Sequence, residues 1–389
     1  MTPMQQLSPI GRSVIEDFVR QRTKTPDRFH LTVSPEDEMY LYHVSDAPEG
    51  DVDDWLLSYF ESGSMMIEEL RPIFDHVFGG FDKLDSLLEF ACGHGRFTRF
   101  LVQELDPERI SVSDIYADAV EFQRKEFGVR GIVSALEPSD YQDERRYDCI
   151  LVCSLFSHLP ERTFHLWLGK LLALLTDEGV LIFTVHDEAV GPAMGRSSAG
   201  HKKPRITFSP ESESRSLDKH VYGTTFVNEA FCRRAIEKAS KGLASYARKP
   251  KGLWRYQDVY VVSMANPERL ASLNVAPGLE GFVERCDASE GRYILGGWAH
   301  DFRKGEEVEL VELLKEGERV QVCIPAHDRP DVAAHYDDDT MIGSGWVCMV
   351  DESRLPDTSI VSVRITSSTG ERRVIAFNSV ARLFQRPVR

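Results

Sequence analysis

The stretch SLLEFACGHGRFTRFL, residues 86–101, joins an apolar run, a group of small residues around Gly93 and Gly95, and an amphipathic run. This order predicts a buried strand over 86–90, a tight turn, and a helix over 96–104. Glycines in such a turn let a ligand lie against bare backbone, and the N-terminus of the helix supplies free N–H groups. The stretch therefore indicates a ligand-binding turn.

The same alternation of strand and helix continues over residues 84–264. Further strands are predicted at 110–115, 130–134, 147–155, 180–185, Tyr246 and 256–264, and further helices at 118–127, 162–175 and 228–239. Strands separated by helices of ten or more residues form βαβ units and a parallel sheet. Ligands of such sheets bind at the carboxyl edge of the strands. Asn228 is the expected N-cap of the last helix.

The remaining segments of the first half are less regular. Residues 1–55 are predicted to be an N-terminal extension, mostly irregular or helical up to residue 45. The stretch 54–77 has helical spacing broken near Ser62 and Gly63, which predicts two helices joined at the glycine. After His186 the pattern lapses, and we expect a functional lid or a disordered insert at about 188–226.

A shift in composition over 265–278 predicts a linker, and residues 279–389 form a second domain. Short strand-like runs occur at 293–299, 308–314, 320–324, 359–365 and 372–377, separated by turn residues. This arrangement is typical of a small all-β sandwich or jelly roll. The chain is therefore expected to combine an α/β domain with a C-terminal all-β sandwich domain.

Composition excludes several classes of function. The 389 residues carry 62 acidic and 46 basic side chains, a formal net charge of −16, which disfavours binding to nucleic acid and to anionic lipid. The basic run at 201–205 is interpreted as a solvated loop. No apolar run approaches the length of a membrane span, and the N-terminal residues lack a signal-peptide core, so a cytoplasmic location is expected. Seven cysteines without a CxxC pair indicate reduced thiols.

The missing third small residue and the acidic residue Glu89 distinguish this glycine turn from a dinucleotide site. The dinucleotide fingerprint needs a third small residue where Thr98 stands. The run from Glu89 to Gly95 instead resembles the E-x-G-x-G-x-G motif of class I S-adenosylmethionine-dependent methyltransferases, with Ala91 in place of the first glycine. The resemblance covers roughly residues 55–264, and Asp114 follows at the end of the second strand. It implies a methyltransferase domain over 56–264 with a Rossmann-like, seven-stranded, mostly parallel sheet.

The resemblance also implies roles for individual residues. Glu89 would orient the amino group of the cofactor's methionine moiety, Asp114 would receive both ribose hydroxyls, and Ile115 would pack on adenine. Ser134 stands where many members carry an acidic residue that contacts the adenine amino group. The residues predicted to bind S-adenosyl-L-methionine are Tyr59, Gly63, Glu89, Ala91, Gly93, His94, Gly95, Asp114, Ile115, Ser134 and Ser154. The alternatives are a surface ion pair for Glu89, a helix cap for Asp114, and a core position for Tyr59.

Three histidines lie on loops expected at the ligand edge, namely His158, His186 and His220. Each is a candidate general base for a hydroxyl or amine acceptor, and each has a structural alternative. Asp187 adjoins His186, but neighbouring side chains on an extended run point apart. No cluster of carboxylates is clear at the strand ends, so we expect no metal.

The runs SLFSHLP, YGTTF and LWRYQDVYVV resemble methyltransferases associated with bacterial glycan biosynthesis, and the C-terminal part resembles β-sandwich modules found beside such enzymes. The resemblance implies O-methylation of a sugar or a surface-polysaccharide precursor. Trp298 and Trp346 are expected in the core rather than as sugar platforms. Two alternatives stay open: methylation of a small natural product, and a non-catalytic scaffold in a glycan-assembly complex. A homo-oligomer or a glycan-assembly partner that binds through the β-sandwich is also compatible.

Overall fold

The computed structural model describes residues 2–46, 50–191, 203–212, 214, 216–265, 267–273 and 278–384. It divides into two compact units, one of residues 1–6 and 23–275 and the other of residues 7–22 and 276–389. The domain limits drawn from the sequence stay a prediction. Part of the expected linker and part of the expected insert lie outside the described residues.

The first unit alternates strands and helices along its sequence. Its strands are β1 (Leu87–Phe90), β2 (Ile110–Asp114), β3 (Arg130–Val133), β4 (Tyr147–Val152), β5 (Leu175–Asp187), β6 (Ile206–Ser209), β7 (Thr224–Val227), β8 (Ser245–Leu253) and β9 (Gln257–Ser263). Its helices are η1 (Pro3–Gln6), η2 (Pro26–Arg28), α2 (Glu38–Asp46), α3 (Val52–Phe78), η3 (Phe81–Lys83), α4 (Thr98–Leu101), η4 (Pro107–Arg109), α5 (Ala117–Phe127), α6 (Glu161–Ala173), η5 (Glu188–Val190), α7 (Glu229–Ala239) and α8 (Glu268–Ala271).

The central sheet has the predicted Rossmann-like form. Strands β3, β2, β1, β4 and β5 lie side by side in that order and are parallel. Strand β9 then pairs antiparallel with β5, and β8 pairs antiparallel with β9, which completes seven strands. The pair β6–β7 extends the far end of β5, where His186 pairs with Phe226. The prediction of a mostly parallel seven-stranded sheet is confirmed.

The order of the strands places the glycine turn at the switch point of the sheet. Strand β1 lies between β2 and β4, so Phe90 pairs with Ser113 on one side and Val152 on the other. The strand order reverses at this point, and ligands of open α/β sheets bind outside the carboxyl ends of the strands there. The ends of β1, β2 and β4 therefore meet where the sequence predicted a ligand site.

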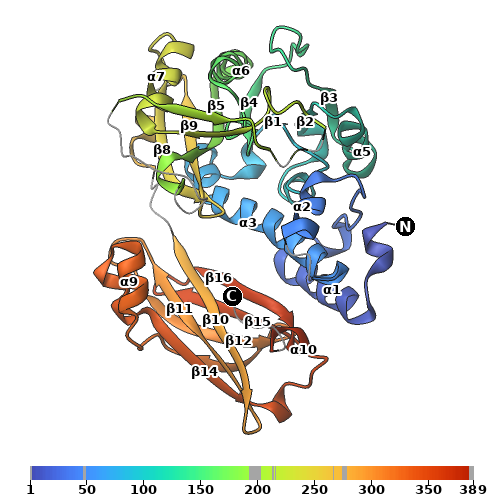
Figure 1. Ribbon diagram of the computed structural model, residues 1–389, viewed down its shortest axis with the longest axis vertical. Helices are drawn as coiled ribbons and strands as arrows, with labels where there is room; N and C mark the ends of the chain where they lie inside the picture. The colour runs from blue at the N-terminus through green and yellow to red at the C-terminus, as the bar shows by residue number, and fades with distance from the viewer. Residues whose placement is uncertain are drawn as a thin grey trace. The chain divides into compact units, whose positions relative to one another are not determined.

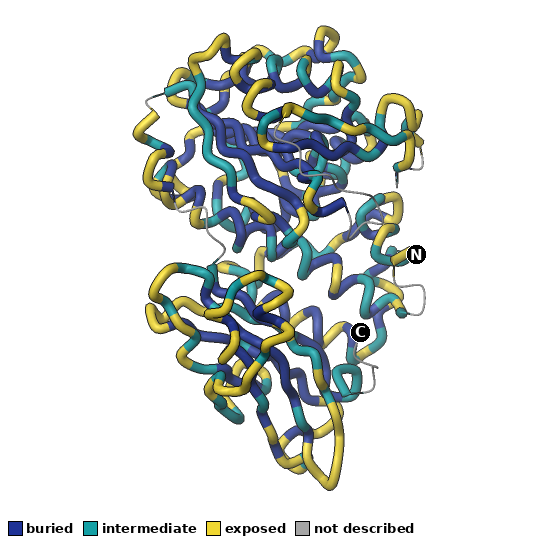
Figure 2. Tube along the Cα trace, turned by 60° about the vertical axis from the view of Figure 1, so that its left-hand side comes forward, coloured by how far each residue is buried: buried dark blue, intermediate teal, exposed yellow. Residues whose placement is uncertain are grey.

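Apolar packing on the sheet is dense. Helices α6 and α7 contribute Trp167, Leu168, Phe231 and Ile236 to one buried cluster with residues of β1, β4, β5 and β9. Figure 1 shows these two helices on one side of the sheet and α3 and α5 on the other. Strands β1, β2, β4 and β9 of the central sheet are almost continuously buried (Figure 2), as expected for strands covered on both faces, whereas the edge strands β3 and β8 are partly exposed.

Helix α3 corrects the prediction of two helices joined at Gly63. It runs unbroken over Val52–Phe78, capped by Asp51, whose side chain accepts the Asp54 N–H. A Cβ atom at Gly63 would lie 2.4 Å from the Arg96 carbonyl oxygen and 2.7 Å from the Phe100 ring. The glycine therefore permits close packing of the α4 region against α3 and does not break the helix.

Two further expectations need correction. The helix expected over 96–104 is short, because regular α-helix covers Thr98–Leu101 and the flanking residues form turns. The expected insert contains strands β6 and β7 among its described residues. The capping prediction is confirmed, since the Asn228 side chain accepts the Phe231 N–H at 3.0 Å.

The second unit is an all-antiparallel two-sheet structure. Its elements are α1 (Pro9–Arg22), β10 (Leu279–Ser289), β11 (Arg292–Asp301), β12 (Val308–Lys315), β13 (Glu318–Cys323), α9 (Pro330–Tyr336), η7 (Asp339–Ser344), β14 (Gly345–Asp351), η8 (Glu352–Arg354), β15 (Ile360–Ser367), β16 (Arg372–Ser379) and α10 (Val380–Leu383). One sheet has the order β10-β11-β14 and the other β13-β12-β15-β16.

The core of this unit lies between the two sheets, as in a sandwich. Trp346 is 1% exposed inside it, and Trp298 is 5% exposed beneath α9, so both tryptophans are core residues. Helix α1 also belongs here, although in sequence it lies between the two segments of the first unit. Its Phe18 is fully buried, with a ring centroid 5.7 Å from that of Phe377 in β16.

Candidate active site

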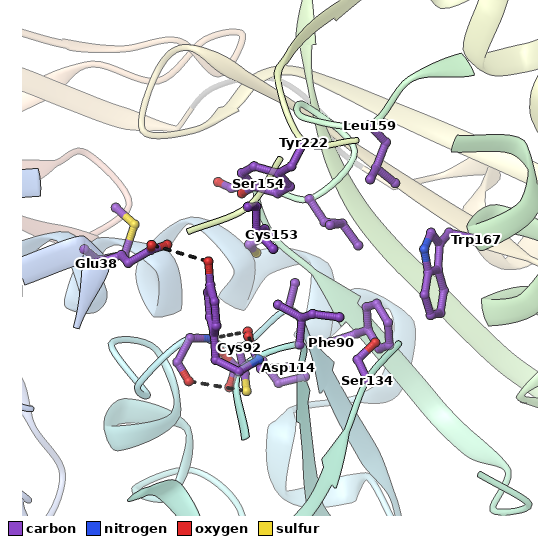
Figure 3. Close-up of a pocket in the computed structure, with 18 of the residues that line it drawn as sticks. Glu38, Phe90, Cys92, Asp114, Ser134, Cys153, Ser154, Leu159, Trp167 and Tyr222 are labelled. Atoms are coloured by element: carbon purple, nitrogen blue, oxygen red, sulfur yellow. Dashed lines mark hydrogen bonds between the residues drawn. The ribbon is translucent and has the colours of Figure 1, made fainter. Parts of the chain in front are cut away.

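A cavity opens at the carboxyl edge of the central sheet, where the glycine turn lies. It is lined by the turn and the ends of β1, β2 and β4, by the start of α2, by residues 134–137, by α6, and by Leu217, Val221 and Tyr222. Figure 3 shows Glu38, Asp114, Ser134, Ser154, Trp167 and Tyr222 around this space. Eight of the predicted cofactor-binding residues line it: Glu89, Ala91, Gly93, His94, Asp114, Ile115, Ser134 and Ser154.

The turn after β1 has left-handed backbone at alternating positions. Ala91, Gly93 and Gly95 have φ values of 60°, 54° and 85°. A Cβ at Gly93 would meet none of the described atoms within 4 Å, whereas one at Gly95 would lie 2.3 Å from the Phe127 ring. Gly95 is therefore required for packing, while the bare backbone of Gly93 faces open space in the cavity wall. Such a turn suits close approach of a ligand.

Asp114 ends β2 and is fixed by the same turn. Its Oδ2 accepts the Gly93 N–H at 2.8 Å, and its Oδ1 accepts the Tyr116 N–H at 3.0 Å. Burial raises the pKa of this carboxyl, and the two N–H donors oppose the shift. Each carboxylate oxygen has a second lone pair, so the group can still accept two neighbouring hydroxyl donors.

Glu89 lies inside β1 and is 6% exposed. Burial raises the pKa of its carboxyl to about 8, against the opposing effects of Thr98 and the Arg96 guanidinium. The Thr98 hydroxyl lies 2.6 Å from both Glu89 Oε2 and Gln123 Oε1. Because Thr98 has one proton to donate, a protonated Glu89 satisfies both contacts. The surface ion pair considered from the sequence is thus absent among the described residues, and Glu89 is a buried acid at the cavity.

An apolar slot lies beside Ser134. Phe90, Leu159 and Trp167 line it, and the rings of Phe90 and Trp167 are 4.8 Å apart. The Ser134 N–H donates to the Asp114 carbonyl oxygen at 2.7 Å, which fixes this loop to the end of β2. These side chains form an apolar part of the cavity wall on one side of the carboxylate, against which a flat ring can pack.

The N-terminal segment closes another side of the cavity through Asp37, Glu38 and Met39. The Tyr116 hydroxyl donates to Glu38 Oε1 at 3.4 Å, and the Ser214 hydroxyl donates to the same oxygen at 3.3 Å. Three separate parts of the chain therefore meet at this carboxylate: the start of α2, the turn after β2, and the segment between β6 and β7. Sequence reasoning did not identify Glu38, because nothing local places it near the glycine turn.

Tyr59 and Gly63 do not line the cavity. Tyr59 is fully buried in α3, where its hydroxyl donates to Asp37 Oδ2 at 2.6 Å. Gly63 packs against Arg96 as described above. The structure thus places both residues one layer behind the wall, and Tyr59 takes the core position that was its alternative.

His158 stands behind the cavity wall with its orientation fixed. Its Nδ1–H donates to the Gly223 carbonyl oxygen at 2.7 Å, so Nε2 is the nitrogen that can accept a proton. Its ring stacks on Tyr222 with centroids 4.5 Å apart and an interplanar angle of 11°. Tyr222 in turn lines the cavity.

His186 has a different environment. The Gln257 side-chain N–H donates to its Nε2 at 3.5 Å, and its Nδ1 has no hydrogen-bond partner among the described residues. Burial, and then His158, lower the pKa of His186 to about 4, so the ring is neutral at pH 7. Asp187 points away and pairs with Arg248 at 2.9 Å, as the geometry of an extended strand predicts.

The third histidine is set apart from the other two. His220 is exposed, and its backbone N–H donates to Asp218 Oδ1 at 2.8 Å. It is not among the residues that line the cavity. The structure thus brings His158 and His186 together, with ring centroids 6.2 Å apart, and leaves His220 at the surface.

Besides Glu38, two further residues of the site were not identified from the sequence. Arg96 lines the cavity next to Glu89, and its guanidinium lies 4.5 Å from the centre of the Trp254 ring. Gln257 bridges the ends of two strands, since its amide bonds to the hydroxyls of Ser154 and Thr184 at 2.9 and 2.6 Å. Arg96 could have been identified from the sequence, because it directly follows the glycine turn. Gln257 could not, because its place at the site depends on the pairing of β9 with β5.

The sequence predicts neither a metal site nor a membrane-spanning helix. Within the described ranges, histidine, cysteine, aspartate and glutamate side chains do not gather in threes that could hold a metal ion. Within the same ranges, no helix has both the length and the apolar character to cross a membrane.

Comparison with known proteins adds a family for the central part of this unit. Residues 88–181, from β1 into β5, match a family model described as a methyltransferase domain. The chain therefore carries a methyltransferase domain. No curated protein matches the sequence significantly.

Similar solved structures include three methyltransferases. A complex of DhpI with SAH is 17% identical, covers 58% of this chain and 94% of its own, and has a TM-score of 0.36. An S-adenosylmethionine-dependent methyltransferase from Clostridium acetobutylicum is 14% identical, covers 58% and 97%, and has a TM-score of 0.37. The plantazolicin methyltransferase BamL with a desmethylPZN analog and SAH is 12% identical, covers 59% and 97%, and has a TM-score of 0.38.

Proposed function

Since residues 88–181 carry a methyltransferase domain, we propose that this chain transfers a methyl group from S-adenosylmethionine to a hydroxyl group of a sugar or a surface-polysaccharide precursor. The observation that carries the cofactor assignment is Asp114, a buried carboxylate at the end of β2 whose two oxygens are aligned by the N–H groups of Gly93 and Tyr116. A carboxylate held in this way offers the paired acceptors that two neighbouring ribose hydroxyls need.

The other cavity residues fit the rest of the cofactor. The apolar wall of Phe90, Leu159 and Trp167 beside Ser134 offers a surface on which a purine ring would pack. Glu89 and Arg96 both line the cavity, where Glu89 would hold the ammonium group of the methionine moiety and the Arg96 guanidinium its carboxylate. When bound, S-adenosylmethionine supplies an electrophilic methyl group on a sulfonium sulfur.

Methyl transfer of this kind needs positioning and removal of one proton from the acceptor hydroxyl. The protein positions the reactants through the rigid ends of β1, β2 and β4, which converts an encounter in solution into a fixed geometry. His158 is the candidate general base in this proposal, because Gly223 fixes its tautomer and its ring stacks directly on Tyr222, which lines the cavity. His186 is held neutral by burial, and with a pKa of about 4 it is a weaker base at pH 7.

The sugar acceptor rests on the resemblance of SLFSHLP, YGTTF and LWRYQDVYVV to glycan-associated methyltransferases. The two-sheet second unit is proposed to serve substrate binding or assembly, although its two tryptophans are buried and offer no sugar platform. A cytoplasmic location and the lack of a nucleic-acid partner stay expectations from composition. Methylation of another small molecule is the second candidate, and an acceptor panel of sugar nucleotides and polyketides separates the two.

Calorimetry with S-adenosylhomocysteine tests the cofactor assignment directly. We expect micromolar-range binding that weakens at least about 100-fold in Asp114→Ala, because two hydrogen bonds to a charged group are lost. Asp140→Asn, an exposed carboxylate away from the cavity lining, is the matched control and should bind normally. Absence of binding, or equal binding by wild type and Asp114→Ala, contradicts the proposal. Methyl transfer to any acceptor in a cell extract excludes the scaffold alternative.

A further inference from the structure

The turn between β8 and β9 holds large side chains in a backbone conformation that they rarely adopt. Trp254 and Arg255 have φ values of 50° and 63°, in the left-handed region where glycine and asparagine are favoured. Strain of this kind persists when neighbouring structure fixes it, and it gathers at functional sites. Here helix α3 fixes it: the Trp254 N–H donates to Glu69 Oε2 at 2.8 Å, and the indole N–H donates to the Ser62 carbonyl oxygen at 3.1 Å.

The strained turn begins a continuous row of flat rings. Trp254 stacks with Tyr256 at 6.1 Å between centroids, and Tyr256 lies 5.8 Å from His186. His186 lies 6.2 Å from His158, which stacks on Tyr222 at 4.5 Å. The aromatic row, defined here as Trp254, Tyr256, His186, His158 and Tyr222, therefore connects three separate loops of the first unit.

Both ends of the aromatic row reach the cofactor cavity. At one end the Arg96 guanidinium, which lines the cavity, covers the Trp254 ring. At the other end Tyr222 lines the cavity itself (Figure 3). Between them, Gln257 follows the turn directly and bonds to the Ser154 hydroxyl, a third cavity residue. The row is thus anchored beside the place where Glu89 and Arg96 would hold the methionine end of the cofactor.

Two groups in the row are suited to a ligand. Tyr256 keeps 42% of its surface exposed although its ring packs between Trp254 and His186. The Nδ1 of His186, a residue 5% exposed, has no hydrogen-bond partner among the described residues. A buried polar nitrogen without a partner is costly, and in a native structure it calls for an explanation such as a ligand atom. Here Nδ1 carries the proton, because Nε2 accepts from Gln257.

We propose that the aromatic row is the acceptor subsite, and that it binds an uncharged, hydroxylated six-membered ring whose face lies on Tyr256 and whose hydroxyl oxygen accepts the His186 Nδ1–H. The inference rests on the proposed function, since the subsite is defined by its place beside the methyl donor. Flat aromatic faces bind the apolar face of a ring, and fixed polar groups beside them select its hydroxyls. Pyranose rings and phenols share this chemistry.

Saturation-transfer NMR on the full chain loaded with S-adenosylhomocysteine tests the subsite. The probes are methyl pyranosides and, in a second arm, 4-methylphenol. We expect ring-proton signals with wild-type protein, a loss of about tenfold or more in probe affinity for Tyr256→Ala, and retention within about twofold for Tyr256→Phe. Tyr42→Ala removes a similarly exposed tyrosine, 43% exposed, away from the row, and should behave as wild type.

The outcomes separate this inference from the cofactor assignment. Unchanged probe binding by Tyr256→Ala, or no signal from either probe while S-adenosylhomocysteine binds normally, overturns the acceptor subsite and leaves the cofactor site standing. A signal from 4-methylphenol alone supports the subsite and contradicts the sugar acceptor. Trp254→Phe, which keeps an aromatic ring but loses the indole N–H, should weaken probe binding while S-adenosylhomocysteine affinity stays within about twofold.

Discussion

The Tyr59 hydroxyl donates a 2.6 Å hydrogen bond to Asp37 Oδ2, while Asp37 Oδ1 accepts the N–H groups of Met39 and Tyr40 at 2.9 and 3.3 Å. Asp37 is therefore held from behind by α3 and at the same time starts helix α2. The next two residues in the sequence, Glu38 and Met39, also line the cavity. Tyr59 thus shapes the cavity without touching its interior.

Removal of this hydroxyl should destabilise the protein measurably. We expect Tyr59→Phe to lower the free energy of unfolding by about 1.5–3 kcal/mol, because a hydrogen bond to a buried carboxylate is lost. Tyr246→Phe is the control, since Tyr246 donates to the exposed Glu229 at 3.1 Å and an exposed interaction of this kind contributes about 0–1 kcal/mol. Urea unfolding measures the free energy of unfolding of both variants. Equal decreases would show that the Tyr59–Asp37 hydrogen bond stabilises the protein no more than an exposed one.

Glu89 should link cofactor binding to pH. Without cofactor its carboxyl has a pKa of about 8 and is protonated at pH 7. The ammonium group of the cofactor favours the carboxylate form, so binding releases a proton and strengthens as pH rises toward 8. We expect affinity for S-adenosylhomocysteine to increase about tenfold per pH unit below pH 8 and to level off above it.

Calorimetry in buffers of different ionisation enthalpy counts the protons released. Glu89→Gln cannot release a proton, so its binding enthalpy should not depend on the buffer and its affinity should be nearly flat over this range. Proton release of the same size in Glu89→Gln would assign the linkage to another group.

His158 and His186 should differ in their effect on turnover. With the acceptor probe that binds, His158→Asn is expected to lower kcat by about 10²- to 10⁴-fold while S-adenosylhomocysteine affinity changes little. His186→Asn should lower kcat less, and the shape of its pH profile between pH 5 and 8 should match wild type. The physical reason is that His186, with a pKa of about 4, stays neutral throughout this range. The reverse ranking would make His186 the base.

Arg99 should control the order of the N-terminal segment. Its guanidinium is fully buried, and it donates to the carbonyl oxygens of His30 at 2.7 Å, Thr32 at 3.1 Å and Gly95 at 3.2 Å. Arg99→Met leaves these acceptors buried without a donor, and we expect a loss of about 3 kcal/mol or more. Hydrogen exchange over residues 29–37 should accelerate.

The exposed Arg124 offers a matched control for that variant. Arg124→Met should change the free energy of unfolding by less than about 0.5 kcal/mol. If exchange over residues 29–37 is the same in the two variants, the segment is held by other contacts.

The parts of the fold that follow from local chemistry could be predicted from the sequence. The apolar run before the small residues marked β1, and Asn228 marked the start of α7, because burial and capping act within a few residues. Gly63 was misread as a break, since its real role is the approach of Arg96, which is distant in sequence. Strand β10 was not predicted because many of its residues are exposed and its apolar alternation is weak.

The site was predictable to the same extent. Glu89 and Asp114 lie on strands β1 and β2, next to the turn that holds Gly93, and the spacing of the three residues in the sequence carries the signal. Glu38 reaches the site through its contact with Tyr116 at the start of α5, and Trp254 through its contact with α3. No local sequence pattern indicates either contact. Residues brought to the site by tertiary contacts are thus the ones that sequence reasoning missed.

The burial of Phe18 against Phe377 has a consequence for synthesis on the ribosome. The strand that covers the apolar face of α1, β16, is made about 350 residues after this helix. At about 5–20 residues per second, this face waits roughly tens of seconds for its partner while the first unit has time to fold. The second unit therefore completes its fold around a segment made long before it. In a nascent chain that stalls before β16, the apolar face of α1 stays exposed and can be bound by chaperones.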